Sequence, residues 1–172
     1  MRTHIYVAFI LAVTLFLTGC VEPGESTYNQ GVKALNSGKT AEARVLFVRA
    51  LEENPHIAEA YLNLGRIHIK QGTYAAAREK TLIALEMLEE NQKTIISGNS
   101  WKQQAALACN NMASIAFQQG LELKQSEESD PAEYARLFDE AKSWLAQAYE
   151  LDPNSELIQK NRAFIQRWGQ NQ

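Results

Sequence analysis

The sequence predicts an all-α protein in which about three helix pairs stack into a curved array that a further helix closes. The first indication is an internal period of 34 residues, by which Gly31 and Ala43 recur as Gly65 and Ala77. The second is that apolar residues follow helical spacing within each period, and that Pro55 ends the first one. A fixed period of this length predicts helical repeats that bury their apolar faces against their neighbours.

Residues 1–19 have the pattern of a secretory signal peptide. After a basic start, residues 5–17 form a thirteen-residue apolar run, which suits a signal segment and is short for a membrane span. The tetrapeptide LTGC at positions 17–20 resembles the lipobox of bacterial lipoproteins. The resemblance implies that Cys20 becomes the first mature residue and carries a diacylglycerol and a fatty acyl chain, which bind a bilayer. The alternative is an uncleaved membrane anchor.

The residues around the lipobox also predict a location. Val21 follows the cysteine in place of an aspartate, and in a Gram-negative cell this implies the outer membrane, facing the periplasm. Without residues 1–19 the chain carries 16 basic and 20 acidic side chains, a net charge of −4. This balance argues against a nucleic-acid partner and against electrostatic binding to anionic lipid. The lipid on Cys20 therefore has to supply the anchor, through a short linker over residues 20–24.

The first repeat, residues 25–57, resembles the tetratricopeptide repeat (TPR), a pair of antiparallel helices. The residues that match the family's signature positions are Gly31, Ala43, Phe47, Ala50 and Pro55. The small Gly31 and Ala43 allow the two helices to approach closely, and Phe47 fills the space between them. The resemblance implies a right-handed TPR superhelix, here a single domain over residues 25–172.

The second repeat, residues 58–91, follows the same pattern with two departures. Its small residues in matching positions are Gly65, Ala77 and Ala84. Thr81 replaces the usual aromatic residue, and Glu89 stands where the family has its closing proline. Because the proline is missing, we expect the second helix to run on to about Asn91.

The third repeat, residues 100–153, is stretched. Its matching residues are Ala113, Ala141, Ala148 and Pro153. Ala113 and Ala141 are 28 residues apart, whereas the equivalent Gly31 and Ala43 are 12 apart. The 16 additional residues predict that both helices are longer, by about two turns or on the order of 12 Å. Asp130 and Pro131 predict a capped start of the second helix, behind an acidic tip that contains Glu127 and Glu128.

Two segments do not belong to a repeat. An insertion at residues 92–105 separates repeats two and three, and Ser100 is a candidate N-cap for a helix that begins at Trp101. Residues 154–168 have an amphipathic stripe, which predicts the capping helix that closes such arrays.

The first helices of successive repeats line the concave side of a TPR array, where the family holds peptides or partner helices. By repeat position, this face carries Tyr28, Val32, Leu35, Leu62, Asn63, Arg66, Ile69, Lys70, Asn110, Ser114 and Phe117. An asparagine side chain can hydrogen-bond a partner's backbone, and Arg66 or Lys70 can bind a carboxylate. The alternative is that the apolar members only pack against neighbouring helices.

One known activity of the family is not predicted here. Its chaperone-binding members hold a C-terminal carboxylate with Lys, Asn and Arg at fixed positions. Only Asn63 matches this pattern, because Tyr28, Val32 and Leu107 stand where polar members belong.

The remaining features have plain structural interpretations. Three tryptophans, Trp101, Trp144 and Trp168, lie on helical stripes, so we expect them to pack against the core rather than to form an aromatic ligand surface. The acidic tip can attract a cation or a basic partner, but a run of this kind is more often only solvated.

No catalytic site or cofactor other than the covalent lipid is predicted. Beyond the signal segment there are two histidines, His56 and His68, whose spacing does not match a metal site. Cys109 is expected to be a small buried residue. The chain has no phosphate-binding glycine loop and no serine in a nucleophile elbow.

The sequence therefore predicts a lipid-anchored TPR scaffold that binds other envelope proteins or peptides. A more specific alternative, based on the lipobox together with the repeats, is a pilotin-like factor for secretin or type IV pilus assembly. A third, remote alternative is a lipid-anchored enzyme or metal carrier centred on His56 or His68.

Overall fold

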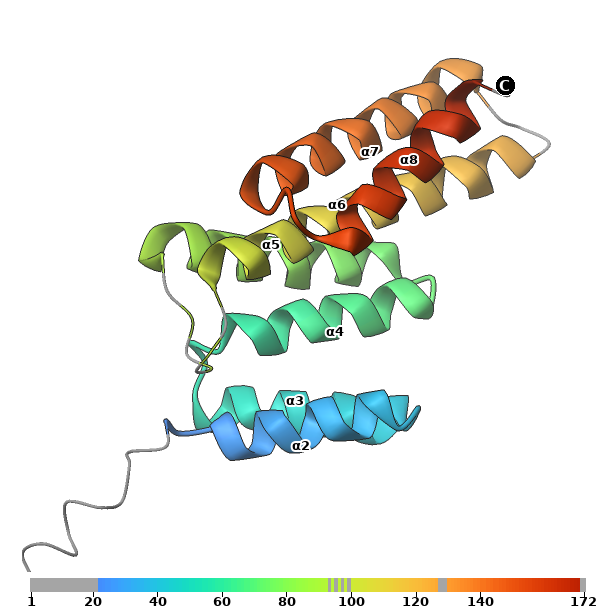
Figure 1. Ribbon diagram of the computed structural model, residues 1–172. Coiled ribbons are helices and arrows are strands. Elements are labelled where there is room, and N and C mark those ends of the chain that lie inside the picture. Colours follow the sequence, from blue (N-terminus) through green and yellow to red (C-terminus); the bar gives the residue numbers. More distant parts are fainter. Residues whose placement is uncertain are drawn as a thin grey trace, which may run out of the picture.

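Helix pairs stack in chain order through the whole domain (Figure 1). The computed structural model describes residues 22–92, 94, 96, 98, 100–126 and 130–170. These residues form seven helices: α2 (Glu25–Asn36), α3 (Thr40–Glu53), α4 (Ala58–Lys70), α5 (Tyr74–Asn91), α6 (Trp101–Gln125), α7 (Pro131–Leu151) and α8 (Glu156–Gln170). The all-α class and the predicted order of helices are confirmed.

The first two pairs are α2 with α3 and α4 with α5, and a glycine brings each pair together. A Cβ atom on Gly31 would lie 2.8 Å from the ring of Phe47, and one on Gly65 would lie 2.5 Å from Oγ1 of Thr81. Close contact between the helices therefore requires glycine at both positions. The prediction that α5 reaches Asn91 is confirmed.

The turns inside these pairs also repeat at the 34-residue period. Gly38 has φ 76° and Gly72 has φ 70°, and each follows the end of a first helix. This left-handed conformation ends the helix and strongly favours glycine. The same left-handed glycine therefore connects the two helices in both pairs.

The third pair, α6 and α7, confirms the predicted lengthening. Its helices have 25 and 21 residues, against 12 and 14 in the first pair. A second close contact, which the sequence interpretation missed, lies further out along the hairpin. There a Cβ on Gly120 would be 2.8 Å from the ring of Phe138. This contact holds the extended part of the hairpin together.

The two predicted N-caps have different outcomes. The carboxylate of Asp130 accepts a hydrogen bond from the backbone N–H of Ala132 at 2.8 Å, so the cap of α7 is confirmed. Ser100 precedes α6 in an extended conformation, as predicted for an N-cap, but its side chain makes no capping hydrogen bond. Glu127 and Glu128 of the acidic tip lie outside the described residues.

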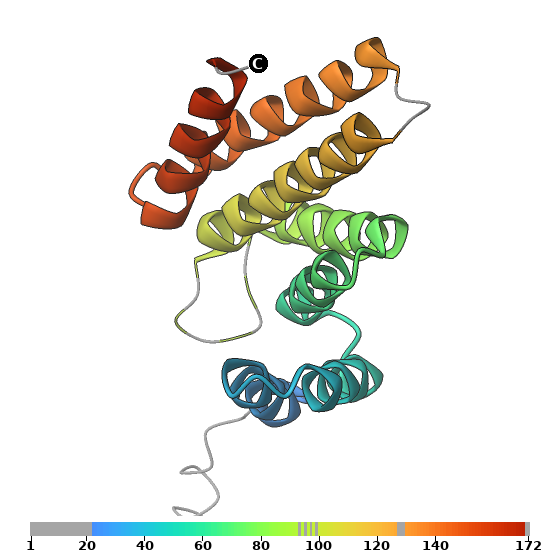
Figure 2. The same ribbon diagram turned by 90° about the vertical axis from the view of Figure 1, so that its right-hand side faces the viewer.

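The segment between α5 and α6 reaches back toward the first helix pair (Figure 2). Ile96 is only 8% exposed and belongs to the core cluster formed by α2, α3 and α4. Its backbone N–H lies 3.4 Å from Oε1 of the fully buried Glu59. Ile96 therefore contributes to the core that α2, α3 and α4 form.

Replacing Ile96 by alanine is expected to lower the free energy of unfolding by about 2 to 3 kcal/mol, because it removes a buried side chain and leaves a cavity. Urea denaturation followed by circular dichroism measures this loss. The matched control is Leu82→Ala on α5, where the side chain is 42% exposed and the expected loss is small. Equal losses in the two variants would show that the insertion does not pack against the first pair.

Thr81 is the one signature aromatic position that carries a hydroxyl. It is fully buried, and its Oγ1 has no hydrogen-bond partner among the described groups. We expect Thr81→Val to raise the free energy of unfolding by about 1 kcal/mol, since valine keeps the shape and removes the unpaired hydroxyl. Thr81→Ser, which keeps the hydroxyl and loses a methyl group, should lower it. A destabilised valine variant would mean that the hydroxyl is satisfied in solution.

The last helix, α8, packs onto the third pair. Ile158 and Ile165 are buried in two neighbouring core clusters. The ring centroid of Trp168 lies 4.1 Å from that of Phe138 on α7. Trp101 and Trp144 also pack against core clusters, so the prediction for all three tryptophans is confirmed. The predicted capping helix is therefore present, shifted by two residues toward the C-terminus.

Candidate functional site

The concave side of the array holds a hollow of about 310 Å³ between α2, α4, α6 and the start of α8. Apolar and amide side chains line it in nearly equal proportion, together with one cation. The lining residues are Tyr28, Val32, Leu35, Asn36, Leu62, Asn63, Arg66, Gln104, Leu107, Asn110, Asn111 and Leu157. Seven of the eleven residues predicted for the binding face meet in this hollow.

A second hollow, of about 290 Å³, continues the first between α6 and α8. Asn110 lines both hollows, and Ser114 and Phe117 line the second. Phe164 of α8 forms the opposite side, with its ring centroid 5.6 Å from that of Phe117. The two hollows together form a groove, called the concave groove below, that runs from the first pair to α8.

Two of the predicted residues lie outside the concave groove. Ile69 is partly buried against the core cluster that Ala77 of α5 forms with Met112 and Ile115 of α6. Lys70, the last residue of α4, is exposed and lines neither hollow. The helical stripe that begins at Leu62 therefore leaves the groove before the helix ends.

Burial divides the remaining residues into a floor and an accessible layer. Leu62, Phe117 and Tyr28 are at most 7% exposed, so their side chains form the floor of the groove. The burial of Leu62 and Phe117 agrees with the packing role that was the alternative for the apolar members. Asn63 is partly exposed and Arg66 is exposed, so these two can reach a bound partner.

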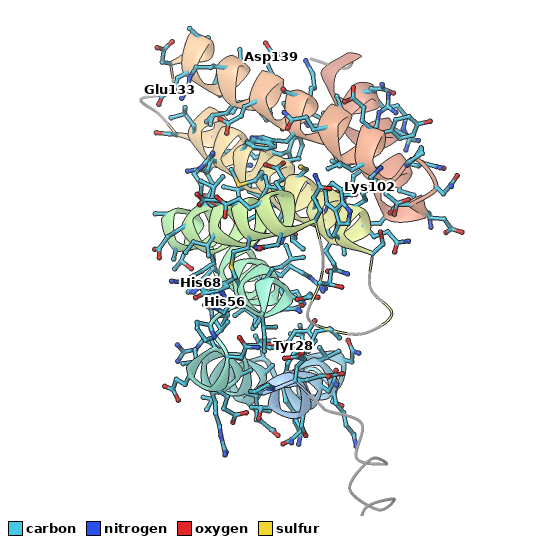
Figure 3. All side chains as sticks on the ribbon, turned by 90° about the vertical axis from the view of Figure 1, so that its left-hand side faces the viewer. Tyr28, His56, His68, Lys102, Glu133 and Asp139 are labelled. Atoms are coloured by element: carbon cyan, nitrogen blue, oxygen red, sulfur yellow. The ribbon has the colours of Figure 1, made fainter. Side chains whose placement is uncertain are left out.

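A hydrogen-bonded chain fixes the polar side of the first hollow. Tyr28 lies between the first pair and α4 (Figure 3), and Nδ2 of Asn63 donates to its hydroxyl at 3.1 Å. Burial, with a smaller contribution from the Glu59 carboxylate, raises the pKa of Tyr28 to about 12, so the phenol stays neutral. Nη1 of Arg66 lies 3.4 Å from Oδ1 of Asn63. Arg66 forms no ion pair with any described residue, so its charge is available.

Amide side chains also join α6 to its neighbours. Asn161 of α8 donates to Oδ1 of Asn110 at 2.7 Å, and Nδ2 of Asn111 lies 3.4 Å from the carbonyl oxygen of Leu62. Asn110 and Asn111 are each 6% exposed, so these bonds form at the floor of the groove. They hold α6 in place relative to α4 and α8.

The contribution of α8 to the groove was missed in the sequence interpretation. Asn161 follows Pro153 by eight residues, as Asn63 follows Pro55. This equal offset places α8 in the position of the first helix of a fourth repeat, which is the side that lines the groove. The signal was present in the sequence but was interpreted only as a cap.

The side chains that could form a metal or catalytic centre do not lie close together. Across residues 22–170, apart from the gaps given above, no three His, Cys, Asp or Glu side chains come close enough to hold a metal ion. His56 precedes α4 by two residues and His68 lies in its last turn, so about 15 Å of helix rise separates them. Burial lowers the pKa of His68, with a smaller effect of the nearby Lys80 and Arg44 charges.

Cys109 is buried as predicted, at 1% exposure. Burial raises the pKa of its thiol to about 11, so it is protonated at neutral pH and is a poor nucleophile. Cys20, the predicted site of lipid attachment, lies outside the described residues. Among the helices described, none has the length and apolar character needed to cross a bilayer.

Comparison with known proteins supports the fold described above. Residues 28–89 match the tetratricopeptide repeat family model. The first TPR of Spaghetti (RPAP3), solved bound to the HSP90 peptide SRMEEVD, is similar at 14% identity and a TM-score of 0.60, over 88% of this chain and 96% of that one. The TPR domain of Arabidopsis OM64 is similar at 15% identity and a TM-score of 0.56, over 87% of this chain and 98% of that one. No curated protein sequence matches the chain. The predicted TPR fold is confirmed.

Proposed function

We propose that this TPR protein is a lipid-anchored scaffold that binds a segment of a partner protein in the concave groove. The observation that carries the proposal is the groove itself, in which an exposed Arg66 with no ion-pair partner among the described residues lies beside amide and leucine side chains. A free cation, amides and apolar surface together match the chemistry of a peptide with apolar and acidic residues. The proposed mechanism is binding alone, without a catalytic step.

The proposed ligand differs from the peptide in the Spaghetti structure. HSP90-type recognition in this family depends on polar and cationic residues at fixed groove positions, and Tyr28, Val32 and Leu107 supply none of them here. Tyr28 and Val32 also pack in the core cluster of the first pair, so their side chains are used for stability. We therefore do not extend the chaperone peptide to this chain.

The membrane part of the proposal rests on the lipobox at residues 17–20 and on Val21. Lipid on Cys20 would hold α2 close to a bilayer, because only four residues lie between Cys20 and Glu25. Four or five extended residues span about 15 Å. The groove would then be presented in the cell envelope, on the periplasmic side of the outer membrane in a Gram-negative cell.

The test is cross-linking and pull-down of the full-length protein from its own cell envelope. Arg66→Glu should lose the partner, since it reverses the charge inside the groove. Lys70→Glu is the matched control, because Lys70 carries the same charge outside the groove. Loss of the partner in both variants, or in neither, would contradict groove binding.

A Cys20→Ala variant tests the anchor separately. It should leave the membrane fraction and lose the mass of the acyl groups, while keeping the partner when both are soluble. A variant that stays in the membrane would contradict lipidation at Cys20. Recovery of a secretin or pilus component in the pull-down would select the pilotin-like role, and its absence would remove that role.

A further inference from the structure

Helix α8 carries exposed apolar side chains on the side that faces the concave groove. Leu157 is 49% exposed and lines the first hollow, and Phe164 is 50% exposed and lines the second. They are seven residues apart on one face of the helix, a rise of about 10.5 Å. A helix that served only to cover the array would be expected to turn polar residues outward here.

The position of α8 explains this exposure. By the offset from the closing prolines, Asn161 is equivalent to Asn63 and Phe164 is equivalent to Arg66. These two α4 side chains are polar, accessible and part of the lining of the first hollow. Phe164 therefore stands where the first helix of a further repeat would present a side chain to a ligand. Leu157 is equivalent by the same offset to the buried Glu59, but here it is exposed and lines the first hollow.

The contact between α6 and α8 leaves hydrogen-bonding atoms at the floor. Asn161 Nδ2 donates to Asn110 Oδ1 at 2.7 Å. Nδ2 of Asn110 and Oδ1 of Asn161 have no partner among the described residues. One donor and one acceptor side by side can pair with the C=O and N–H of a peptide backbone, whatever its sequence.

We propose that α8 is a wall of the binding site, and that the partner segment lies extended along the groove with two apolar side chains against Leu157 and Phe164. Its backbone pairs with Asn110 and Asn161. An acidic side chain or C-terminal carboxylate of the segment lies near Arg66, the exposed cation of the first hollow. This inference rests on the proposed groove function and specifies its ligand as an apolar, acidic, extended peptide.

Spacing distinguishes an extended segment from a helical one. An extended chain of the polyproline II type advances about 3.1 Å per residue with about three residues per turn, so side chains that contact Leu157 and Phe164 from one side come from positions about three residues apart. A helix that lies along α8 advances about 1.5 Å per residue and needs about seven residues for the same distance. The partner residues that touch the two side chains therefore report its conformation.

The experiment is site-specific photo-cross-linking in the intact, lipidated protein in its own cells. A benzophenone amino acid replaces Leu157 or Phe164 in the wall, Asn36 in the first hollow, or Val45 on α3, which is 62% exposed outside the concave groove. We expect adducts of one partner from positions 157, 164 and 36 and none from 45. Mass spectrometry should map the 157 and 164 cross-links about three residues apart, beside an acidic residue.

The other outcomes separate the two proposals. Adducts from position 36 without adducts from 157 and 164 would overturn the role of α8 and leave groove binding intact. Cross-links that map seven residues apart would overturn the extended conformation. Adducts from no groove position, or equally from position 45, would overturn the proposed function as well.

A binding measurement completes the test. The mapped segment is synthesised with a fluorescent label and titrated with the full-length protein in detergent. Leu157→Asp and Phe164→Asp should each weaken its affinity roughly 10-fold, since each places a carboxylate against an apolar anchor near an acidic ligand. Val45→Asp should change it less than about twofold. Circular dichroism must show that all three variants remain folded, and equal affinities would overturn the proposal.

Discussion

Gly65→Trp is expected to destabilise the domain more than any of the other substitutions. A Cβ at this position would already lie 2.5 Å from Oγ1 of Thr81 and 3.4 Å from the carbonyl oxygen of Ala77. An indole ring has to push α4 away from α5, which opens the core on both sides. We expect a loss of at least about 3 kcal/mol, a large part of the stability of a domain this size.

Thermal denaturation followed by circular dichroism measures the effect. The matched control is Gln71→Trp, which adds the same side chain at an exposed position just after α4. Its melting temperature should stay close to that of the wild type. Similar melting temperatures for the two tryptophan variants would refute the pairing of α4 with α5 at Gly65.

Phe138→Ala is expected to have the second largest effect, at about 3 to 5 kcal/mol. The ring is 6% exposed, fits against Gly120 of α6, and has its centroid 4.1 Å from that of Trp168 on α8. Its removal leaves a cavity at the point where α6, α7 and α8 meet. Because Trp168 loses this support, the C-terminal turns of α8 should become the first target of limited proteolysis.

The control for this prediction is Tyr149→Ala, which also removes an aromatic ring from α7. Tyr149 is 36% exposed and its main described contact is the guanidinium of Arg162, 4.1 Å from the ring centroid. A contact of this kind is worth about 1 kcal/mol or less. If urea midpoints and proteolysis rates change equally in the two variants, Phe138 does not support α8 in the way described.

The predictions for Gly65 and Phe138 depend on two glycine contacts, and only one of these contacts could be predicted from the sequence. Gly65 stands at a fixed distance from its equivalent in the first repeat, so its close contact could be predicted from the period alone. Gly120 has no such equivalent, because the third repeat is stretched and its small position was assigned to Ala113. Only the structure shows that the longer hairpin adds a second contact between a glycine and an aromatic ring.

The same difference applies to the candidate site. The positions of Asn63 and Arg66 on the concave side followed from repeat position, and both lie there. Ile69 and Lys70 were assigned to this side by the same reasoning, yet they lie outside the groove. A repeat position determines the direction of a side chain on its own helix, but it does not determine where a neighbouring helix crosses.

Local sequence patterns alone specify the helix pairs, their order and the turns between them. The signals are small residues where two helices touch, glycines in left-handed turns, an N-capping aspartate and apolar residues at helical spacing. Each of these signals lies within one period and needs no knowledge of distant residues.

The packing of segments that are distant in the sequence, by contrast, determines which concave side chains a partner can reach. Only the tertiary structure shows that α8 and Ile96 complete the array. Burial depends on how helices far apart in the sequence pack together, such as α6 against α4 and α8 beside α6. Ile96 lies in a segment without helical periodicity, so no local pattern shows that it packs against the first pair. Long-range packing of this kind is set by the whole fold, because the free energy of burial depends on area contributed by every neighbour.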